Sequence, residues 1–171
     1  MTMPIHSIWL MPTPADEAML TAVVRELAGR FGTPLFAPHL TLRGDTEQPV
    51  AELERAVEAA ARGVSAFTEQ VAVVEGSEAF FRSFYSRFAI SPSLAALKQA
   101  LDPEGFDSFM PHVSLLYGPV EAVAKAEAIR EIDRRLAGQP ISFDGISVVT
   151  SGQDVPIADW RIVFSAKLSG G

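Results

Sequence analysis

The chain has 171 residues and a net charge of −7, contains no cysteine, and is 48% hydrophobic. Its length allows a real hydrophobic core, and the lack of cysteine excludes disulfides, thiolate chemistry and cysteine-bound zinc. No apolar run is long enough for a membrane span, and the first residues lack the basic start and apolar core of a signal peptide. We therefore expect a cytoplasmic protein with no membrane partner.

Apolar periodicity and capping residues predict strands that alternate with helices. In chain order they are a strand over 5–11, a helix from Pro14 to Gly32 with Thr13 as N-cap, a strand over 39–43, a helix over 50–62, strands over 67–75 and 81–90, a short helix over 93–101, a strand over 112–117, a long helix from Pro119 through Gly138, and strands near 141–150 and 160–168. The turn at 76–78 makes 67–75 and 81–90 a hairpin, which favours an α+β fold with largely antiparallel sheets. No linker divides the chain, so residues 1–171 are predicted to form a single domain.

A short internal repeat is the most informative feature of the sequence. The segment FAPHLTL at 36–42 recurs as FMPHVSL at 109–115, nearly half the chain away. Two of the three histidines, His39 and His112, occupy equivalent positions, and each is followed two residues later by a hydroxyl, at Thr41 and Ser114. This arrangement predicts two related lobes, one carrying the motif at 39–41 and the other the motif at 112–114, each contributing one strand to a shared cleft.

The spacing within the repeat has a chemical meaning. On a strand, residues i and i+2 point to the same face, so each histidine projects together with its hydroxyl. Two imidazoles, whose ordinary pKa lies near neutrality, can serve as base and acid on opposite sides of one phosphorus. The hydroxyls of Thr41 and Ser114 can donate hydrogen bonds to the non-bridging oxygens. Such a site requires no metal and no other cofactor.

Other uses of these residues stay open at this point. A single histidine on a strand is often structural, and a zinc site could recruit His6 or Asp45 as a third ligand. A serine hydrolase using Ser114 would lack the usual Gly-x-Ser-x-Gly turn. Because the hydroxyl recurs beside both histidines, we favour phosphoester chemistry. The acidic chain shows no clustered basic surface, so the substrate is expected to be a small nucleotide or an RNA end, with no long duplex as partner.

Both copies of the repeat, Pro38-His39-Leu40-Thr41 and Pro111-His112-Val113-Ser114, resemble the signature of the 2H phosphoesterase superfamily. The stretches SIWLMP at 7–12, HVSLLY at 112–117 and DWRIV at 159–163 are similar to the cyclic nucleotide phosphodiesterase family of plants and yeast. The resemblance covers nearly the whole chain. It implies a bilobal, pseudo-two-fold α+β fold with two largely antiparallel sheets flanked by helices and a cleft between the lobes.

The same resemblance implies an activity. Members of the cyclic nucleotide phosphodiesterase family hydrolyse nucleoside 2′,3′-cyclic phosphates or ADP-ribose 1″,2″-cyclic phosphate, so we expect this activity here, without a metal and with the 2′-phosphate as product. His39 and His112 would be the catalytic residues, with His112 as base and His39 as acid. Thr41 and Ser114 would bind the phosphate. An RNA-end phosphodiesterase or 2′–5′ RNA ligase-like enzyme, and a non-catalytic nucleotide-binding module, are the alternatives.

The resemblance also places three aromatic residues, Trp9, Phe81 and Tyr117, beside the substrate. From the sequence alone, Trp9 is at least as suited to core packing, and strict alternation puts Tyr117 on the face opposite Ser114 unless the strand end is distorted before Gly118. Trp160 favours a structural role at the start of the last strand. Arg43 and Arg82 are expected to be solvated. The sequence carries no signal for an oligomeric state.

Overall fold

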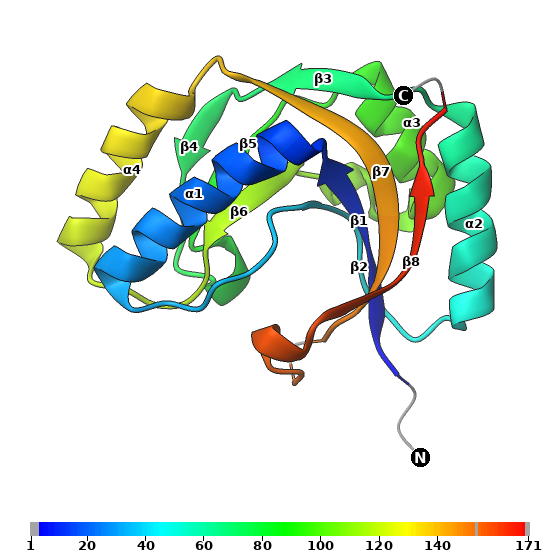
Figure 1. The fold of residues 1–171 in the computed structure, drawn as a ribbon, viewed down its shortest axis with the longest axis horizontal. Helices are drawn as coiled ribbons and strands as arrows, with labels where there is room; N and C mark the ends of the chain where they lie inside the picture. The colour runs from blue at the N-terminus through cyan, green and yellow to red at the C-terminus, as the bar shows by residue number, and fades with distance from the viewer. Residues whose placement is uncertain (1–3, 153, 170–171) are drawn as a thin grey trace.

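A computed structural model describes residues 4–152 and 154–169 (Figure 1). Its strands are β1 (His6–Pro12), β2 (Leu40–Thr46), β3 (Phe67–Gln70), β4 (Val73–Glu75), β5 (Phe84–Arg87), β6 (His112–Leu116), β7 (Pro140–Thr150) and β8 (Arg161–Lys167). Its α-helices are α1 (Pro14–Phe31), α2 (Val50–Gly63), α3 (Pro92–Leu101) and α4 (Ala122–Leu136), and three short 3₁₀ turns are η1 (Phe80–Arg82), η2 (Pro103–Ser108) and η3 (Ile157–Asp159).

The strands form one curled sheet in the order β3-β7-β1-β2-β6-β5-β4, with β8 also paired to β7. Every pair of named strands is antiparallel. The pairing between β2 and β6, at the centre of the sheet, is the shortest, because these strands are joined through the single pair Leu40 and Val113. The α+β class with antiparallel pairing, expected from the sequence, is confirmed; the division into two pseudo-symmetric lobes within one domain stays a prediction.

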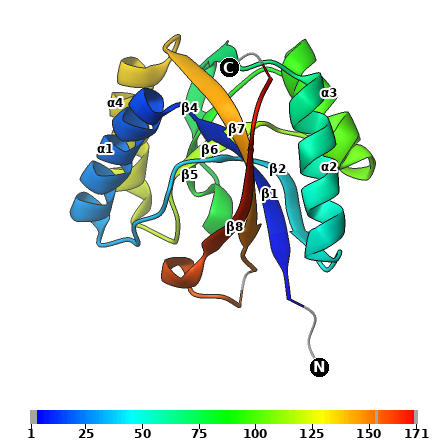
Figure 2. The same cartoon turned by 45° about the vertical axis from the view of Figure 1, so that its right-hand side comes forward.

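Helices flank the two halves of this sheet (Figures 1 and 2). Helices α2 and α3 lie beside the half that contains β1, β2 and β7, and α1 and α4 lie beside the half that contains β4, β5 and β6. Within the described residues, no helix combines the length and apolar character that crossing a lipid bilayer requires.

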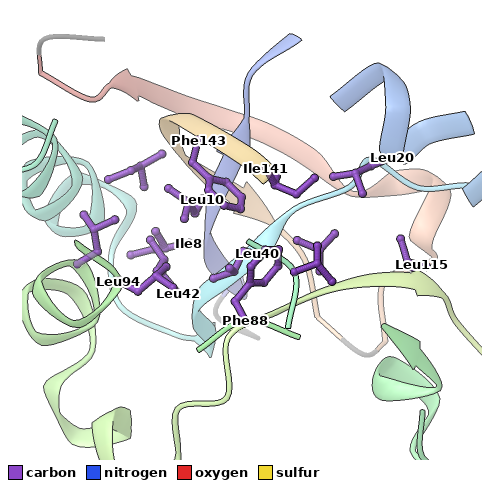
Figure 3. Packing of buried hydrophobic residues seen from close by; sticks show 14 of the residues in the cluster. Ile8, Leu10, Leu20, Leu40, Leu42, Phe88, Leu94, Leu115, Ile141 and Phe143 are labelled. Carbon is purple, nitrogen blue, oxygen red and sulfur yellow. The ribbon is translucent and has the colours of Figure 1, made fainter. Parts of the chain in front are cut away.

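The strands at the centre of the sheet bury their apolar residues on one face. Ile8 and Leu10 of β1 pack with Leu40 and Leu42 of β2 in the core, and all four are fully buried (Figure 3). Burial of each such side chain contributes about 1.5–3 kcal/mol to folding. The alternate residues of these strands are therefore left for the opposite face, where the candidate site lies.

The predicted strand over 67–75 is wrong in one respect, because it is two strands that belong to opposite halves of the sheet. β3 pairs with β7, whereas β4 pairs with β5. Between them the Val71 amide donates to the Gln139 carbonyl and the Ala72 amide donates to the Arg87 carbonyl, so the chain changes partners within two residues. The hairpin predicted from the turn at 76–78 is thus confined to β4 and β5, and Phe81 lies in η1 rather than in a strand.

The last helix also begins later than the sequence predicts. α4 starts at Ala122 rather than at Pro119, because the Glu121 carboxylate accepts hydrogen bonds from the amides of Val123 (3.0 Å) and Ala124 (2.7 Å). A side-chain oxygen that satisfies amides of the first turn is the usual N-cap of a helix. Both bonds favour the ionised carboxylate and lower the pKa of Glu121.

Candidate active site

A cavity of about 340 Å³ opens on the face of the sheet opposite the core. This volume lies in the range of small-molecule pockets, roughly 300–1,000 Å³. All seven residues proposed from the sequence contribute to its lining: Trp9, His39, Thr41, Phe81, His112, Ser114 and Tyr117. The other lining residues are Ser7, Gly44, Asp45, Arg82, Ser151, Gly152 and Trp160.

The pairing of β2 with β6 brings the two copies of the repeat together. Leu40 and Val113 are direct partners and are fully buried. Extending this antiparallel register by one residue sets His39 across from Ser114, and Thr41 across from His112. Each imidazole thus lies next to the hydroxyl of the other copy.

The position of the proton on each imidazole is set by the backbone. Nδ1 of His39 lies 2.8 Å from the Ala37 carbonyl oxygen, and Nδ1 of His112 lies 2.8 Å from the Met110 carbonyl oxygen. A carbonyl only accepts hydrogen bonds, so each Nδ1 carries the proton. Nε2 is therefore the nitrogen of each ring that can gain or lose a proton in the cavity. The repeat produces the same hydrogen bond twice because the carbonyl stands two residues before each histidine.

The environments of the two histidines differ. His39 is 5% exposed, and the Trp9 ring stacks on it with centroids 3.4 Å apart and planes 4° from parallel. Burial lowers the pKa of His39 from 6.5 to about 4, against the opposing effect of the Ala37 carbonyl. His112 is less deeply buried; burial lowers its pKa as well, and the positive charge of Arg82 acts in the same direction. Of the two imidazoles, His39 therefore loses its proton first.

The two hydroxyls of the repeat differ in their present partners. Ser114 is buried, and its Oγ donates to the Phe81 carbonyl oxygen at 3.1 Å. It must turn from that carbonyl to donate to an anion in the cavity. Thr41 is half-buried and lines the cavity.

Four aromatic rings form one wall of the cavity. Phe81 lies 5.1 Å from Tyr117 and 5.9 Å from Trp160, and Trp160 lies 5.9 Å from both Trp9 and Tyr117, measured between ring centroids. Tyr117 reaches this wall because β6 ends at Leu116, so strand alternation no longer governs it. Gly118 follows with φ +108°, a conformation that glycine adopts readily. Burial raises the pKa of Tyr117, so its hydroxyl stays protonated.

Two lining residues have roles that differ from those the sequence favours. Trp160 is expected from the sequence to be structural, yet its ring lies in the aromatic wall, with Nε1 donating to the Val155 carbonyl at 3.2 Å. The DWRIV stretch at 159–163 is the only signal that could have identified it. Arg82 is expected to be solvated; it is exposed and also lines the cavity beside His112. Arg43, by contrast, donates to the Leu101 carbonyl and pairs with Asp102 at 3.8 Å, outside the cavity.

The arrangement of the described side chains gives little support to a zinc site. Across residues 4–152 and 154–169, no three histidine, aspartate or glutamate side chains converge as a metal-binding group. Asp45 lines the cavity, but His6 does not. That the reaction needs no metal stays a prediction.

Solved structures of other proteins share this fold. Comparison with protein-family models and with curated proteins finds no match. The structure is similar to TT0787 of Thermus thermophilus, at 18% sequence identity and a TM-score of 0.64, over 96% of this chain and 97% of that chain. It is also similar to Escherichia coli LigT in its apo form, at 14% identity and a TM-score of 0.60, over 96% and 97% of the two chains.

A further similar structure is described as a phosphoesterase, with 14% identity, a TM-score of 0.58 and coverage of 96% of this chain and 98% of that chain. At these identities the comparisons establish a shared fold. The α+β class with antiparallel pairing, which the resemblance to the 2H phosphoesterases implied, is thereby confirmed, although the strands form one sheet rather than two.

Proposed function

We propose that this protein is a 2H phosphoesterase that hydrolyses a 2′,3′-cyclic phosphate by acid–base catalysis between His39 and His112. The observation that carries the proposal is the convergence of both copies of the repeat in one cavity, each with Nδ1 held by a carbonyl and Nε2 available. Two imidazoles on a pair of adjacent strands suit in-line displacement at phosphorus, in which one imidazole takes a proton and the other gives one.

The difference in burial supports one assignment of the acid and base roles. In the singly protonated pair, the proton resides on His112, because the pKa of the deeply buried His39 falls to about 4. Nε2 of neutral His39 takes a proton from water as its oxygen attacks phosphorus. The bond from phosphorus to the 3′-oxygen breaks, and Nε2–H of His112 protonates that oxygen. This reverses the assignment suggested by the sequence, and the product remains the 2′-phosphate.

The remaining lining residues have supporting roles in this proposal. Thr41 and Ser114 donate hydrogen bonds to the non-bridging oxygens, and Arg82 contributes positive charge beside them. Trp9, Phe81 and Tyr117, with Trp160, form the apolar wall against which a base or sugar packs.

A small nucleotide is the substrate that the cavity favours. Its volume of about 340 Å³ suits one nucleotide, and the net charge of −7 disfavours a long nucleic acid. Among the proteins of this fold, LigT has been crystallised with 3′-AMP, ATP and NADP+. These complexes support a nucleotide ligand for the present cavity, and an RNA 2′,3′-cyclic end is the second candidate.

The test is hydrolysis of adenosine 2′,3′-cyclic phosphate in H₂¹⁸O, with separation of the 2′- and 3′-monophosphates. We expect the 2′-phosphate, labelled once in the phosphate group. His6→Gln is the matched control, because His6 is the third histidine and lies outside the cavity. Turnover of an oligonucleotide with a cyclic end, but not of the mononucleotide, would select the RNA-end alternative, and binding without turnover would select the non-catalytic one.

A further inference from the structure

One end of the cavity is polar and lies away from the repeat. It is formed by Ser7 on β1, Asp45 on β2 and Ser151 just after β7. Ser7 precedes Trp9 by two residues on the same strand, a distance of about 7 Å. Asp45 lies at the same level, because it stands between Arg43 and Thr46, the partners of Ile8 and His6. A phosphate held between the histidines therefore does not contact this end, whereas the nucleoside attached to it extends along the strands.

The hydrogen bonds at the polar end have a fixed direction. Ser151 Oγ donates to Asp45 Oδ1 at 3.2 Å, because an ionised carboxylate only accepts. Ser7 Oγ lies 2.8 Å from Ser151 Oγ, and since the Ser151 proton is committed to Asp45, Ser7 is the donor of that pair. Both serines are buried, at 3% and 4% exposed, so water does not compete freely for these bonds.

This direction leaves only acceptors for a ligand. Both serine protons are used in the series of hydrogen bonds that runs from Ser7 through Ser151 to Asp45. Asp45 is the exposed member of the three and has a second carboxylate oxygen. Ser7 and Asp45 thus offer lone pairs to the cavity, and the carboxylate adds negative charge. A group that donates an O–H or N–H bond is favoured there, and a second phosphate is repelled.

We propose that Ser7, Asp45 and Ser151 form a subsite that accepts a hydrogen bond from the nucleoside part of the substrate and rejects a second phosphate. The inference rests on the proposed function, because it takes the phosphate to lie between His39 and His112. It favours nucleoside 2′,3′-cyclic phosphates with a free 5′-hydroxyl over ADP-ribose 1″,2″-cyclic phosphate, which carries a diphosphate. The donor is either the 5′-hydroxyl or an amino group of the base.

The test measures binding rather than turnover. Dissociation constants of adenosine 2′-monophosphate and adenosine 2′,5′-bisphosphate are determined by calorimetry for the wild-type protein, for Asp45→Asn and for Asp107→Asn. Asp107 is exposed and outside the cavity, so its variant makes the same charge change without touching the subsite. The 5′-deoxy analogue and purine riboside 2′-phosphate, which lack the 5′-hydroxyl and the amino group respectively, show which donor is bound.

The wild-type protein is expected to prefer the monophosphate. Asp45→Asn should raise the dissociation constant of the monophosphate about tenfold or more, as expected for a lost hydrogen bond to a charged group. It should leave the dissociation constant of the bisphosphate unchanged or lower it. Asp107→Asn should change neither constant more than about twofold. Equal weakening of both ligands in Asp45→Asn, or an unchanged preference, would overturn the subsite.

Turnover of adenosine 2′,3′-cyclic phosphate, measured on the same preparations, separates the two proposals. Wild-type turnover with an unchanged preference in Asp45→Asn overturns the subsite alone. A changed preference without any wild-type turnover overturns the proposed hydrolysis and leaves the subsite standing.

Discussion

Replacing Trp9 should change the protonation of His39 without removing the imidazole. The Trp9 ring covers one face of the His39 ring at 3.4 Å and keeps water from it. The fall of the pKa from 6.5 to about 4 corresponds to about 3 kcal/mol in favour of the neutral imidazole, because each pKa unit is worth about 1.4 kcal/mol. Attraction between a cation and the indole face acts in the opposite direction by about 0.5–2 kcal/mol, so desolvation is the larger effect.

We therefore expect Trp9→Leu to raise the pKa of His39 by about 1–2 units, since water then reaches one face of the ring. The assay is an NMR titration of the histidine Cε1–H signals, with His39→Gln used to assign the signal of His39. Trp9→Phe keeps an aromatic ring over the imidazole and should keep the low pKa. It also keeps the test valid if the smaller side chain of Trp9→Leu unfolds the protein.

Trp160→Leu is the matched control for that titration, because Trp160 lines the cavity but its ring stands next to Trp9 rather than next to His39. It should leave the pKa of His39 near 4. A wild-type His39 that titrates near 6.5, or a pKa that stays near 4 in Trp9→Leu, would refute the desolvation argument.

Three other groups of contacts can be tested by substitution. His39→Ala and His112→Ala should each lower kcat by about 10²–10⁴-fold with the fold intact, measured by steady-state hydrolysis and circular dichroism, and near-normal turnover in either variant would contradict the assignment. Thr41→Val and Ser114→Ala should each cost about 2–4 kcal/mol of transition-state stabilisation in kcat/KM, and a phosphate bound in a crystal away from both hydroxyls would count against this role. Lys98→Met should lower the free energy of unfolding in urea by about 3 kcal/mol, because Lys98 is 7% exposed, pairs with Asp102 at 2.9 Å and donates to the Leu42 carbonyl of β2 at 2.7 Å. Lys167→Met, which removes an exposed ammonium, should lower it by less than about 1 kcal/mol. Equal losses in the two variants would contradict the role of the buried ion pair.

The repeat could be interpreted from sequence because the alternation of a strand is a local property. It correctly indicated that His39, just before β2, and Thr41 in β2 line the same cavity as His112 and Ser114 of β6, with Leu40 and Val113 between them in the core. The carbonyl that holds each Nδ1 is equally local, since it stands two residues earlier in each copy.

The features that were missed depend on partners distant in the sequence. The exchange of partners between β3 and β4 depends on backbone pairing with Gln139 and Arg87, which no pattern within 67–75 encodes. Ser7 and Ser151 meet across 144 residues, so the polar end of the cavity had no sequence signal. The low pKa of His39 follows from its burial, to which the stacked Trp9 ring contributes, and this tertiary environment is not visible in the near-identical motifs.

The two-histidine mechanism is tested by the pH dependence of kcat/KM for adenosine 2′,3′-cyclic phosphate, measured with EDTA present. The active form carries a neutral His39 and a protonated His112, so the rate should rise as the pH passes about 4 and fall as it passes the lowered pKa of His112, below its usual 6.5. The bell should therefore be centred on the acid side of neutrality. A rate that rises monotonically with pH and disappears with EDTA would show that a metal-bound hydroxide attacks phosphorus, and the two-histidine mechanism would be wrong.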